Sequence, residues 1–372
     1  MSSEANNLHD FMNIAEDIHI TSYRNIPDLD KKFTDFFQKC NQLCAAYVYN
    51  YLLSSSCSRQ INIDTLRNKL NISNNFTKFY RYMLKILNED GLIKIEGNTL
   101  TFKSNQEKLI DIATLKNSYP MFKGTLTLLK HCINHYPEAL SETIPSISVL
   151  FPKGSTSFLD ELHSQDTNIY SEMPIIRDIA IQAISKINNT TSLQILEIGG
   201  GRGLFTRQLF DYVKSTHNLQ YHFTDLSKRF IIDMKRYGNE KKIRNLHSFK
   251  FDVTRDPLSQ NLIPNSYDII IGQDIVHATS NLELTLKNLQ SLLSKNGTLC
   301  LLETTSTGRW NNLIMGITHG WWVFNDNWRE FTPLIQTDAW QSVLQLTGYT
   351  KTHVVFFDNF HSDAALIIAS MG

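Results

Sequence analysis

The chain has 372 residues, with 36 basic and 36 acidic side chains and a formal net charge of zero. Balanced charge argues against broad electrostatic binding of nucleic acid, and no apolar run approaches the ~20 residues that cross a bilayer. The first ten residues lack the apolar core of a signal peptide. We therefore expect a cytoplasmic protein with no membrane or nucleic-acid partner. No metal-binding spacing occurs among the scattered cysteines, which fit reduced thiols: Cys40, Cys44, Cys57, Cys132 and Cys300.

The first third of the chain predicts a helical lobe behind a polar leader, residues 1–32. Apolar residues recur at three and four positions in helices predicted over 33–53, 63–70 and 76–87, and 92–102 reads as a hairpin with a Gly97-Asn98 turn. Three helices and a hairpin make residues 33–104 a winged-helix-like lobe. Residues 59–108 hold nine Lys/Arg against five Asp/Glu, too few for a dense phosphate-binding face. We expect the lobe to cover a substrate pocket or to form a dimer.

The rest of the chain predicts an α/β domain. Residues 105–173 form a mostly helical connector, and 174–372 form the catalytic domain, which opens with a helix at 174–187. Seven apolar runs separated by helical stretches predict a Rossmann-like, seven-stranded sheet whose final strand is antiparallel. The predicted strands are 193–198, 221–225, 248–253, 267–273, 297–303, 352–358 and 364–369, and an aromatic insertion at 308–332 interrupts the sheet region.

A glycine turn follows the first of these strands. The spacing is G-x-G-x-G, with an acid just before the first glycine, and it resembles motif I of Rossmann-like S-adenosyl-L-methionine methyltransferases. Glycine lets the backbone turn sharply and lets a ligand lie against it. Acids also end the second and third strands, at the sheet edge where such folds bind ligands. The predicted donor-binding residues are Glu197, Gly199, Gly201, Gly203, Asp225, Leu226, Asp252, Val253 and Gln273.

Two residues at the same predicted edge could carry catalysis. His277 follows the fourth strand and Glu303 ends the fifth. A carboxylate beside an imidazole holds its tautomer and stabilises its cation, so this pair predicts a general base. Enzymes that methylate amines of nucleic-acid bases usually carry N/D-P-P-Y/F here, whereas this chain has Gly272-Gln-Asp-Ile. Nucleic-acid N-methylation is therefore disfavoured.

The aromatic insertion is too rich in large rings for a solvated loop. We predict that Trp321, Trp322 and Phe324 wall the acceptor pocket and exclude water. The alternative is that these rings pack onto the winged lobe.

With these residues in hand, the chain resembles the C-methyltransferase domains of polyketide synthases and hybrid peptide–polyketide synthases. The resemblance covers most of the length and is carried by residues 43–48, 87–92, 150–155, 195–199, 221–225, 276–282, 301–305, 320–324 and 334–340. It implies that His277 and Glu303 are a catalytic dyad, which removes a proton from the α-carbon of a β-ketoacyl chain on a carrier protein. It also implies that Tyr170 lines the pocket. A free-standing version meets a carrier protein in trans or acts on a released small molecule.

Three readings stay open at this point. The first is carbon methylation of a carrier-bound thioester, and the second is an O-methyltransferase for small molecules that uses the same histidine. The third is a non-enzymatic descendant that binds ligand or DNA, against which the glycine turn, the strand-end acids, His277 and Glu303 weigh. Arg202 stands where the family usually has a small or polar residue, so the edge of the donor pocket differs there. The sequence does not decide between a monomer and a homodimer.

Overall fold

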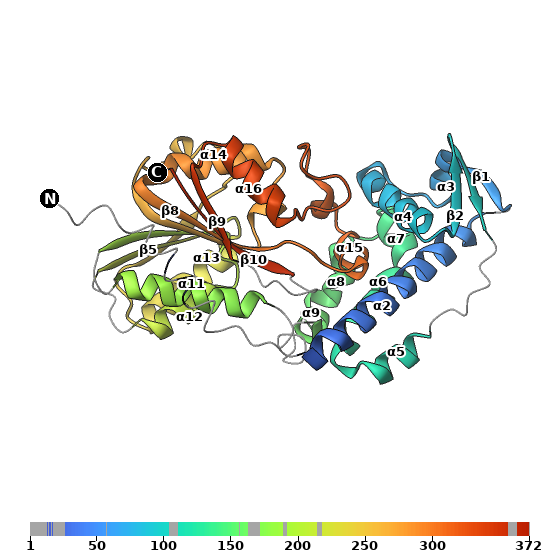
Figure 1. The fold of residues 1–372 in the computed structure, drawn as a ribbon, viewed down its shortest axis with the longest axis horizontal. Coiled ribbons are helices and arrows are strands. Elements are labelled where there is room, and N and C mark those ends of the chain that lie inside the picture. The colour runs from blue at the N-terminus through green and yellow to red at the C-terminus, as the bar shows by residue number, and fades with distance from the viewer. Residues whose placement is uncertain are drawn as a thin grey trace.

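Two bodies lie side by side along the long axis of the molecule, a helical N-terminal lobe and an α/β domain (Figure 1). The computed structural model describes residues 13, 15, 17, 27–56, 58–103, 111–155, 157–162, 172–188, 192–213, 218–355 and 363–371.

The N-terminal lobe has the element order and sheet order of a winged helix. Its first helix begins at Pro27, earlier than expected, because proline suits the first turn of a helix. The three-stranded sheet has the order β1-β3-β2, and the sequence pattern missed its first strand. The elements are α2 Pro27–Ser54, β1 Gln60–Asn62, α3 Ile63–Lys69, α4 Thr77–Glu89, β2 Ile93–Glu96 and β3 Thr99–Phe102.

Short helices follow the three-stranded sheet in the chain. They pack on the same core as α2 and α4, to which they contribute Leu126, Leu129 and Tyr136. The described elements are α5 Ile112–Ser118, α6 Lys123–Asn134, α7 Tyr136–Leu140, α8 Ile147–Leu150 and α9 Ser157–Leu162, with single 3₁₀ turns at Pro120–Phe122 and Pro152–Gly154.

The second body is built on a seven-stranded sheet of order β6-β5-β4-β7-β8-β10-β9. β10 is antiparallel to both of its neighbours, and the other pairings are parallel. The predicted fold class is confirmed. The strands are β4 Leu193–Ile198, β5 Leu219–Asp225, β6 Leu246–Lys250, β7 Tyr267–Gln273, β8 Leu293–Thr304, β9 Lys351–Val355 and β10 Ala364–Ser370.

Helices cover both faces of this sheet (Figure 1). One face packs against α11 Met173–Asn188, α12 Leu204–Tyr212 and α13 Lys228–Glu240, and the other against α14 Leu282–Leu292 and α16 Thr337–Leu346. Successive strand residues point to opposite faces. Ile195, Ile269, Ile271 and Leu302 share a core with α11, whereas Leu196, Ile198, Ile270 and Leu301 share one with α14. By this alternation, Glu197 and Gln273 lie on the α11 face and Glu303 lies on the α14 face.

The aromatic insertion joins the two bodies. Its helix α15 Arg309–Met315 and the 3₁₀ turn His319–Trp322 leave the sheet domain and enter the core of the N-terminal lobe. Arg309 makes a bidentate ion pair with Asp90 (2.7 and 2.8 Å), and the Tyr136 hydroxyl donates to the carbonyl of Leu313 (2.7 Å). The insertion is therefore part of the structure of the lobe.

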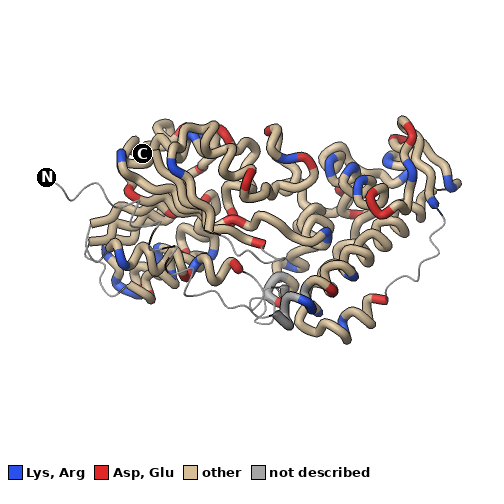
Figure 2. The backbone as a smooth tube through the Cα atoms, in the orientation of Figure 1, with Lys and Arg blue, Asp and Glu red and all other residues tan. Residues whose placement is uncertain are grey.

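Surface charge is mixed along the described part of the chain. Lys and Arg are interspersed with Asp and Glu over both bodies (Figure 2). In a winged helix α4 would enter the DNA groove, but here seven of its thirteen residues are buried. One of them, Phe79, stacks on Trp322 of the insertion with 5.3 Å between ring centroids. Among the described residues, no helix is long and apolar enough to cross a membrane.

Candidate active site

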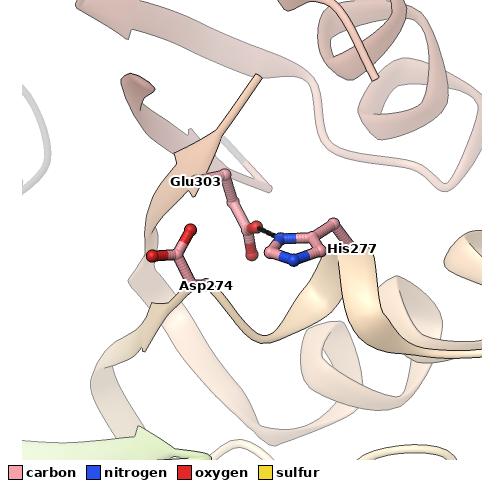
Figure 3. Close-up of side chains that lie close together, drawn as sticks. All are labelled: Asp274, His277 and Glu303. Carbon is pink, nitrogen blue, oxygen red and sulfur yellow. Dashed lines mark hydrogen bonds and ion pairs between the residues drawn. The ribbon is translucent and has the colours of Figure 1, made fainter. Parts of the chain in front are cut away.

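His277 and Glu303 lie together at the carboxyl edge of the sheet (Figure 3). β7 and β8 are parallel neighbours paired up to Gln273 and Leu302, so the residues that follow them meet at one edge. The imidazole Nδ1 of His277 is hydrogen-bonded to Oε2 of Glu303. His277 is 7% exposed and Glu303 is fully buried. The structure therefore brings the two predicted catalytic residues into contact.

Glu303 also shapes the loop that carries the histidine. Its Oε1 accepts hydrogen bonds from the backbone N–H of Val276 (2.9 Å) and of Ile275 (3.3 Å). An ionised carboxylate only accepts hydrogen bonds, so the imidazole proton must lie on Nδ1. Nε2 of His277 then carries a lone pair and, within the described residues, makes no hydrogen bond. The arrangement leaves Nε2 able to take a proton.

The charges around His277 set its proton affinity. Burial lowers the pKa of His277, but the negative charge of Glu303 and its hydrogen bond raise it more, with a smaller contribution from Asp274. The net pKa of His277 lies above its ordinary value. A base of raised proton affinity suits removal of a carbon-bound proton, whose own acidity is low.

Two residues of the insertion, which the sequence pattern missed, also hold the loop that carries His277. The buried Arg329 donates from Nη1 to the carbonyl of His277 (2.6 Å) and is paired with the buried Asp326. Oδ2 of Asp326 accepts from the N–H of Leu282 at the start of α14 (3.0 Å). The insertion thus fastens the His277 loop to the helix behind it. The signal in the sequence was that Asp326 and Arg329 are charged residues within an otherwise aromatic segment.

The glycine turn after β4 has the backbone that its sequence predicts. Gly199, Gly201 and Gly203 have φ of 57°, 54° and 73°, a region in which other residues are strained. A Cβ on Gly199 would lie 2.5 Å from Ile275, and one on Gly203 would lie 2.0 Å from Met234. A Cβ on Gly201 would meet nothing closer than 3.9 Å. The turn is therefore tightly packed at its two ends and open at Gly201. Arg202 beside it is exposed.

Asp225, at the end of β5, is bound to the glycine turn. Its Oδ2 accepts from the N–H of Gly201 (2.9 Å), and its Oδ1 accepts from the N–H of Ser227 (2.7 Å). Each oxygen keeps a further lone pair for a ligand hydroxyl. Leu226 follows it with a side chain that is 57% exposed, an apolar surface beside the turn.

Asp252 and Val253 follow β6 at the same edge. Oδ1 of Asp252 accepts from the N–H and the hydroxyl of Thr254 (3.0 and 2.6 Å). Oδ2 accepts no hydrogen bond within the described residues, which leaves it for a ligand donor. Val253 is 7% exposed.

Glu197 and Gln273 lie on the α11 face of the sheet. Oε2 of the buried Glu197 accepts from the hydroxyls of Thr206 and Tyr221, the latter at 3.0 Å. Burial raises the pKa of Glu197 to about 7, although these two hydrogen bonds oppose the rise. The Oε1 of Gln273 is buried and lacks a donor.

The three predicted pocket aromatics divide between two places. Trp321 packs at the edge of the lobe core and meets the His277 ring edge-on, with 6.5 Å between centroids. Trp322 and Phe324 are 4% and 2% exposed and belong to the core of the N-terminal lobe, as in the packing alternative. Tyr170 lies outside the described residues.

The described residues include one group with the composition of a metal site. Asp274, His277 and Glu303 each offer a ligand atom, and these atoms lie within 4.8 Å of one another. Nδ1 of His277 and Oε2 of Glu303 are already bonded to each other, and Oε1 of Glu303 is held by backbone N–H groups. A cation here would have to break the dyad. The donor set therefore favours proton transfer.

Comparison with known proteins agrees with this geometry. A family model described as a methyltransferase domain matches residues 196–299, and the chain carries such a domain. The sequence is 25% identical over 349 residues to a non-reducing polyketide synthase of Gibberella zeae, covering 89% of this chain and 16% of that protein. The chain thus spans only a small part of the synthase that it matches.

Solved structures share the whole fold. The carbon methyltransferase CurJ superimposes with a TM-score of 0.81 at 24% identity, covering 98% of this chain and 99% of that one. The trans-methyltransferase CalH, solved in complex with SAH, gives a TM-score of 0.64 at 20% identity, covering 91% and 90%. The expected resemblance to the C-methyltransferase domains of polyketide synthases is confirmed.

Proposed function

We propose that this chain, with its methyltransferase domain and its similarity to polyketide synthases, is an S-adenosyl-L-methionine-dependent C-methyltransferase that acts on the α-carbon of a β-ketoacyl thioester. The observation that carries the proposal is the buried pair of His277 and Glu303, with Nε2 of the histidine left to act as a base.

The residues at the sheet edge fit the methyl donor. Gly201 leaves room for a ligand against the backbone, the Asp225 carboxylate can accept from ribose hydroxyls, and Oδ2 of Asp252 can accept from the adenine amino group. When bound, the donor supplies a methyl group on a positively charged sulfur and leaves as S-adenosyl-L-homocysteine.

The dyad would prepare the acceptor. The carbon between a ketone and a thioester is acidic because both carbonyls delocalise the charge of its anion. Nε2 of His277 would remove one of its protons, and the electron pair of the broken C–H bond would form an enolate. Glu303 would stabilise the imidazolium that results, as the aspartate carboxylate does in a catalytic triad. The proton leaves His277 for solvent after methyl transfer.

The proposal for the acceptor rests on the position of Trp321 and on the similarity of the chain to polyketide synthases. Trp321 is the aromatic ring of the insertion that meets His277, and it would help to exclude water from the enolate. Similarity to polyketide synthases supports an acyl chain on a carrier protein as the acceptor. CalH is a trans-methyltransferase, which supports delivery of the acceptor by a separate partner.

Proton exchange tests the proposal without the donor. An acetoacetyl carrier protein in heavy water should gain deuterium at its α-carbon when wild-type protein is added. His277→Ala should lose this exchange, since a positioned base contributes about 10²- to 10⁴-fold. His247→Ala, which removes an exposed histidine from β6, is the matched control and should exchange as wild type does.

Methyl transfer then separates carbon from oxygen acceptors. With donor present, mass spectrometry should find one added methyl group on the acetoacetyl α-carbon. Methylation of small phenols with no transfer to the acetoacetyl thioester would instead identify an O-methyltransferase. Exchange that persists in His277→Ala would remove the histidine from the proton step.

A further inference from the structure

One helix of the N-terminal lobe, α4, contacts the aromatic insertion along a single side. Lys78, Tyr82 and Lys85 are spaced by four and three residues, so they share one side of the helix. The Tyr82 ring lies against that of Trp322, with 6.3 Å between ring centroids, and Nζ of Lys85 lies 5.4 Å from the centroid of the Phe331 ring. This side of α4 is therefore bound to the insertion and is not a free surface.

Lys78 binds the insertion through both backbone and side chain. Its Nζ donates to the carbonyl of Trp322 (3.2 Å) and to the carbonyl of Phe324. The same Nζ lies 3.8 Å from the centroid of the Phe324 ring, within the range of a cation–π contact. One charged group of the lobe thus fixes the main chain and the ring of Phe324 together.

Phe324 connects Lys78 to the buried Arg329. The centre of the Arg329 guanidinium lies 5.3 Å from the centroid of the Phe324 ring, so both cations lie against one aromatic ring. Burial and the positive charge of Arg329 lower the pKa of Lys78, whereas the negative charge of Asp326 opposes this. Both charged residues of the insertion therefore lie near enough to act on Lys78.

Arg329 in turn holds the His277 loop. It binds Asp326 through Nε (3.2 Å) and Nη2, and it binds the carbonyl of His277 through Nη1 (2.6 Å). A planar guanidinium donates in fixed directions, so its contacts set orientation as well as distance. A shift of Arg329 would therefore be passed to the backbone of His277.

We propose that Lys78 is a positioning residue for the reaction, which orients His277 through Phe324 and Arg329. The lobe would thereby set the distance between Nε2 of His277 and the acceptor carbon. Because a misplacement of about 1 Å at a reacting group can cost about 10²-fold in rate, a lysine outside the site can control turnover. The inference rests on the proposed function, in which His277 is the base.

Protection of the His277 loop tests this link without any substrate. The backbone N–H groups of Val276 and Thr279 are hydrogen-bonded, so their exchange with heavy water reports opening of the loop. Lys78→Met should raise the amide exchange rate of a peptide covering residues 275–282 about tenfold, since hydrogen bonds from a charged donor are lost. Arg81→Met, which removes an exposed cation from the same helix, is the matched control and should leave the rate unchanged.

Two other variants at this position complete the test. Lys78→Arg keeps a charged donor and can stack on an aromatic ring, so it should restore the protection. Lys78→Gln keeps one neutral donor and should show a smaller loss in the same direction, which serves if methionine prevents folding. Unchanged protection in both Lys78→Met and Lys78→Gln would overturn the proposal.

Kinetics separate positioning from binding. In α-proton exchange of an acetoacetyl carrier protein, Lys78→Met should lower the maximal rate about tenfold and leave KM for the carrier protein within about twofold. Affinity for S-adenosyl-L-homocysteine should also stay within about twofold, because the polar contacts that the structure gives Lys78 are to the insertion. A loss confined to KM would place Lys78 in acceptor binding and would overturn the proposal.

A double-mutant cycle tests the route through Arg329. Arg329→Lys keeps a cation beside Asp326 but loses the fork that reaches the carbonyl of His277. If Lys78 acts through Arg329, the double variant with Lys78→Met should be no more than about twofold slower than Arg329→Lys alone. Losses that multiply would show another route and would overturn the proposal. Wild-type protein that exchanges no α-protons, while the loop opens more readily in Lys78→Met, would refute the proposed function and leave Lys78 as the residue that orders the loop.

Discussion

Replacing Glu303 by glutamine removes the negative charge of the dyad and keeps its shape. The amide oxygen can still accept from the N–H groups of Ile275 and Val276, which Glu303 now holds. The amide NH₂ group would face Nδ1 of His277 and cannot accept its proton. The loop should therefore keep its place while the imidazole loses the partner that stabilises its cation.

The hydrogen bond between Glu303 and His277 sets the size of the expected loss in exchange rate and the direction in which its pH midpoint should move. Hydrogen bonds to charged groups contribute about 1.5–3 kcal/mol, so loss of this one should slow α-proton exchange about tenfold to a hundredfold. Glu303 is what raises the pKa of His277 against burial, which lowers it. The neutral imidazole is the active form, so the wild-type rate should rise with pH through a midpoint above the ordinary histidine value of about 6.5. In Glu303→Gln this midpoint should move to lower pH.

The assay is α-proton exchange of an acetoacetyl carrier protein in heavy water, measured across pH by mass spectrometry. Glu240→Gln is the matched control, because it removes the same charge from an exposed site on α13. A lower plateau together with an unshifted or higher midpoint would refute our account of Glu303. Wild-type rates at every pH would remove Glu303 from the mechanism.

Three further predictions concern the donor turn and the insertion. Asp225→Asn should weaken S-adenosyl-L-homocysteine about tenfold to a hundredfold in calorimetry, because charge-assisted bonds to the ribose are lost; unchanged affinity would remove Asp225 from the site. Trp322→Ala should lower the free energy of unfolding by about 3–5 kcal/mol in denaturant titrations, since Trp322 fills the lobe core; a loss under about 1 kcal/mol would contradict this packing. Trp321→Ala should slow acceptor turnover and destabilise the protein less than Trp322→Ala, because Trp321 lies between that core and His277; full turnover would leave the ring without a role in the pocket.

The sequence by itself determined the sheet and the edge at which the site lies. The apolar runs at 193–198 and 267–273 match β4 and β7 to the residue, because strands buried on both faces need continuous apolar side chains. Parallel strands share one carboxyl edge, so residues just past them, such as His277 and Asp225, could be assigned to one site before any coordinates. The three lobe helices and the hairpin followed from periodicity and turn residues in the same way.

Tertiary structure alone decided which side chains touch. Apolar periodicity reports that a residue is buried and not what buries it, so the sequence predicted Trp322 and Phe324 as pocket wall, whereas both lie in the lobe core. Arg329 lies 52 residues from the carbonyl of His277 that it binds, and no local pattern encodes such a contact. Arg177 reads in sequence as one charge on an apolar helix. Its burial without a partner, on the face that Gln273 shares, exists only once α11 packs on the sheet.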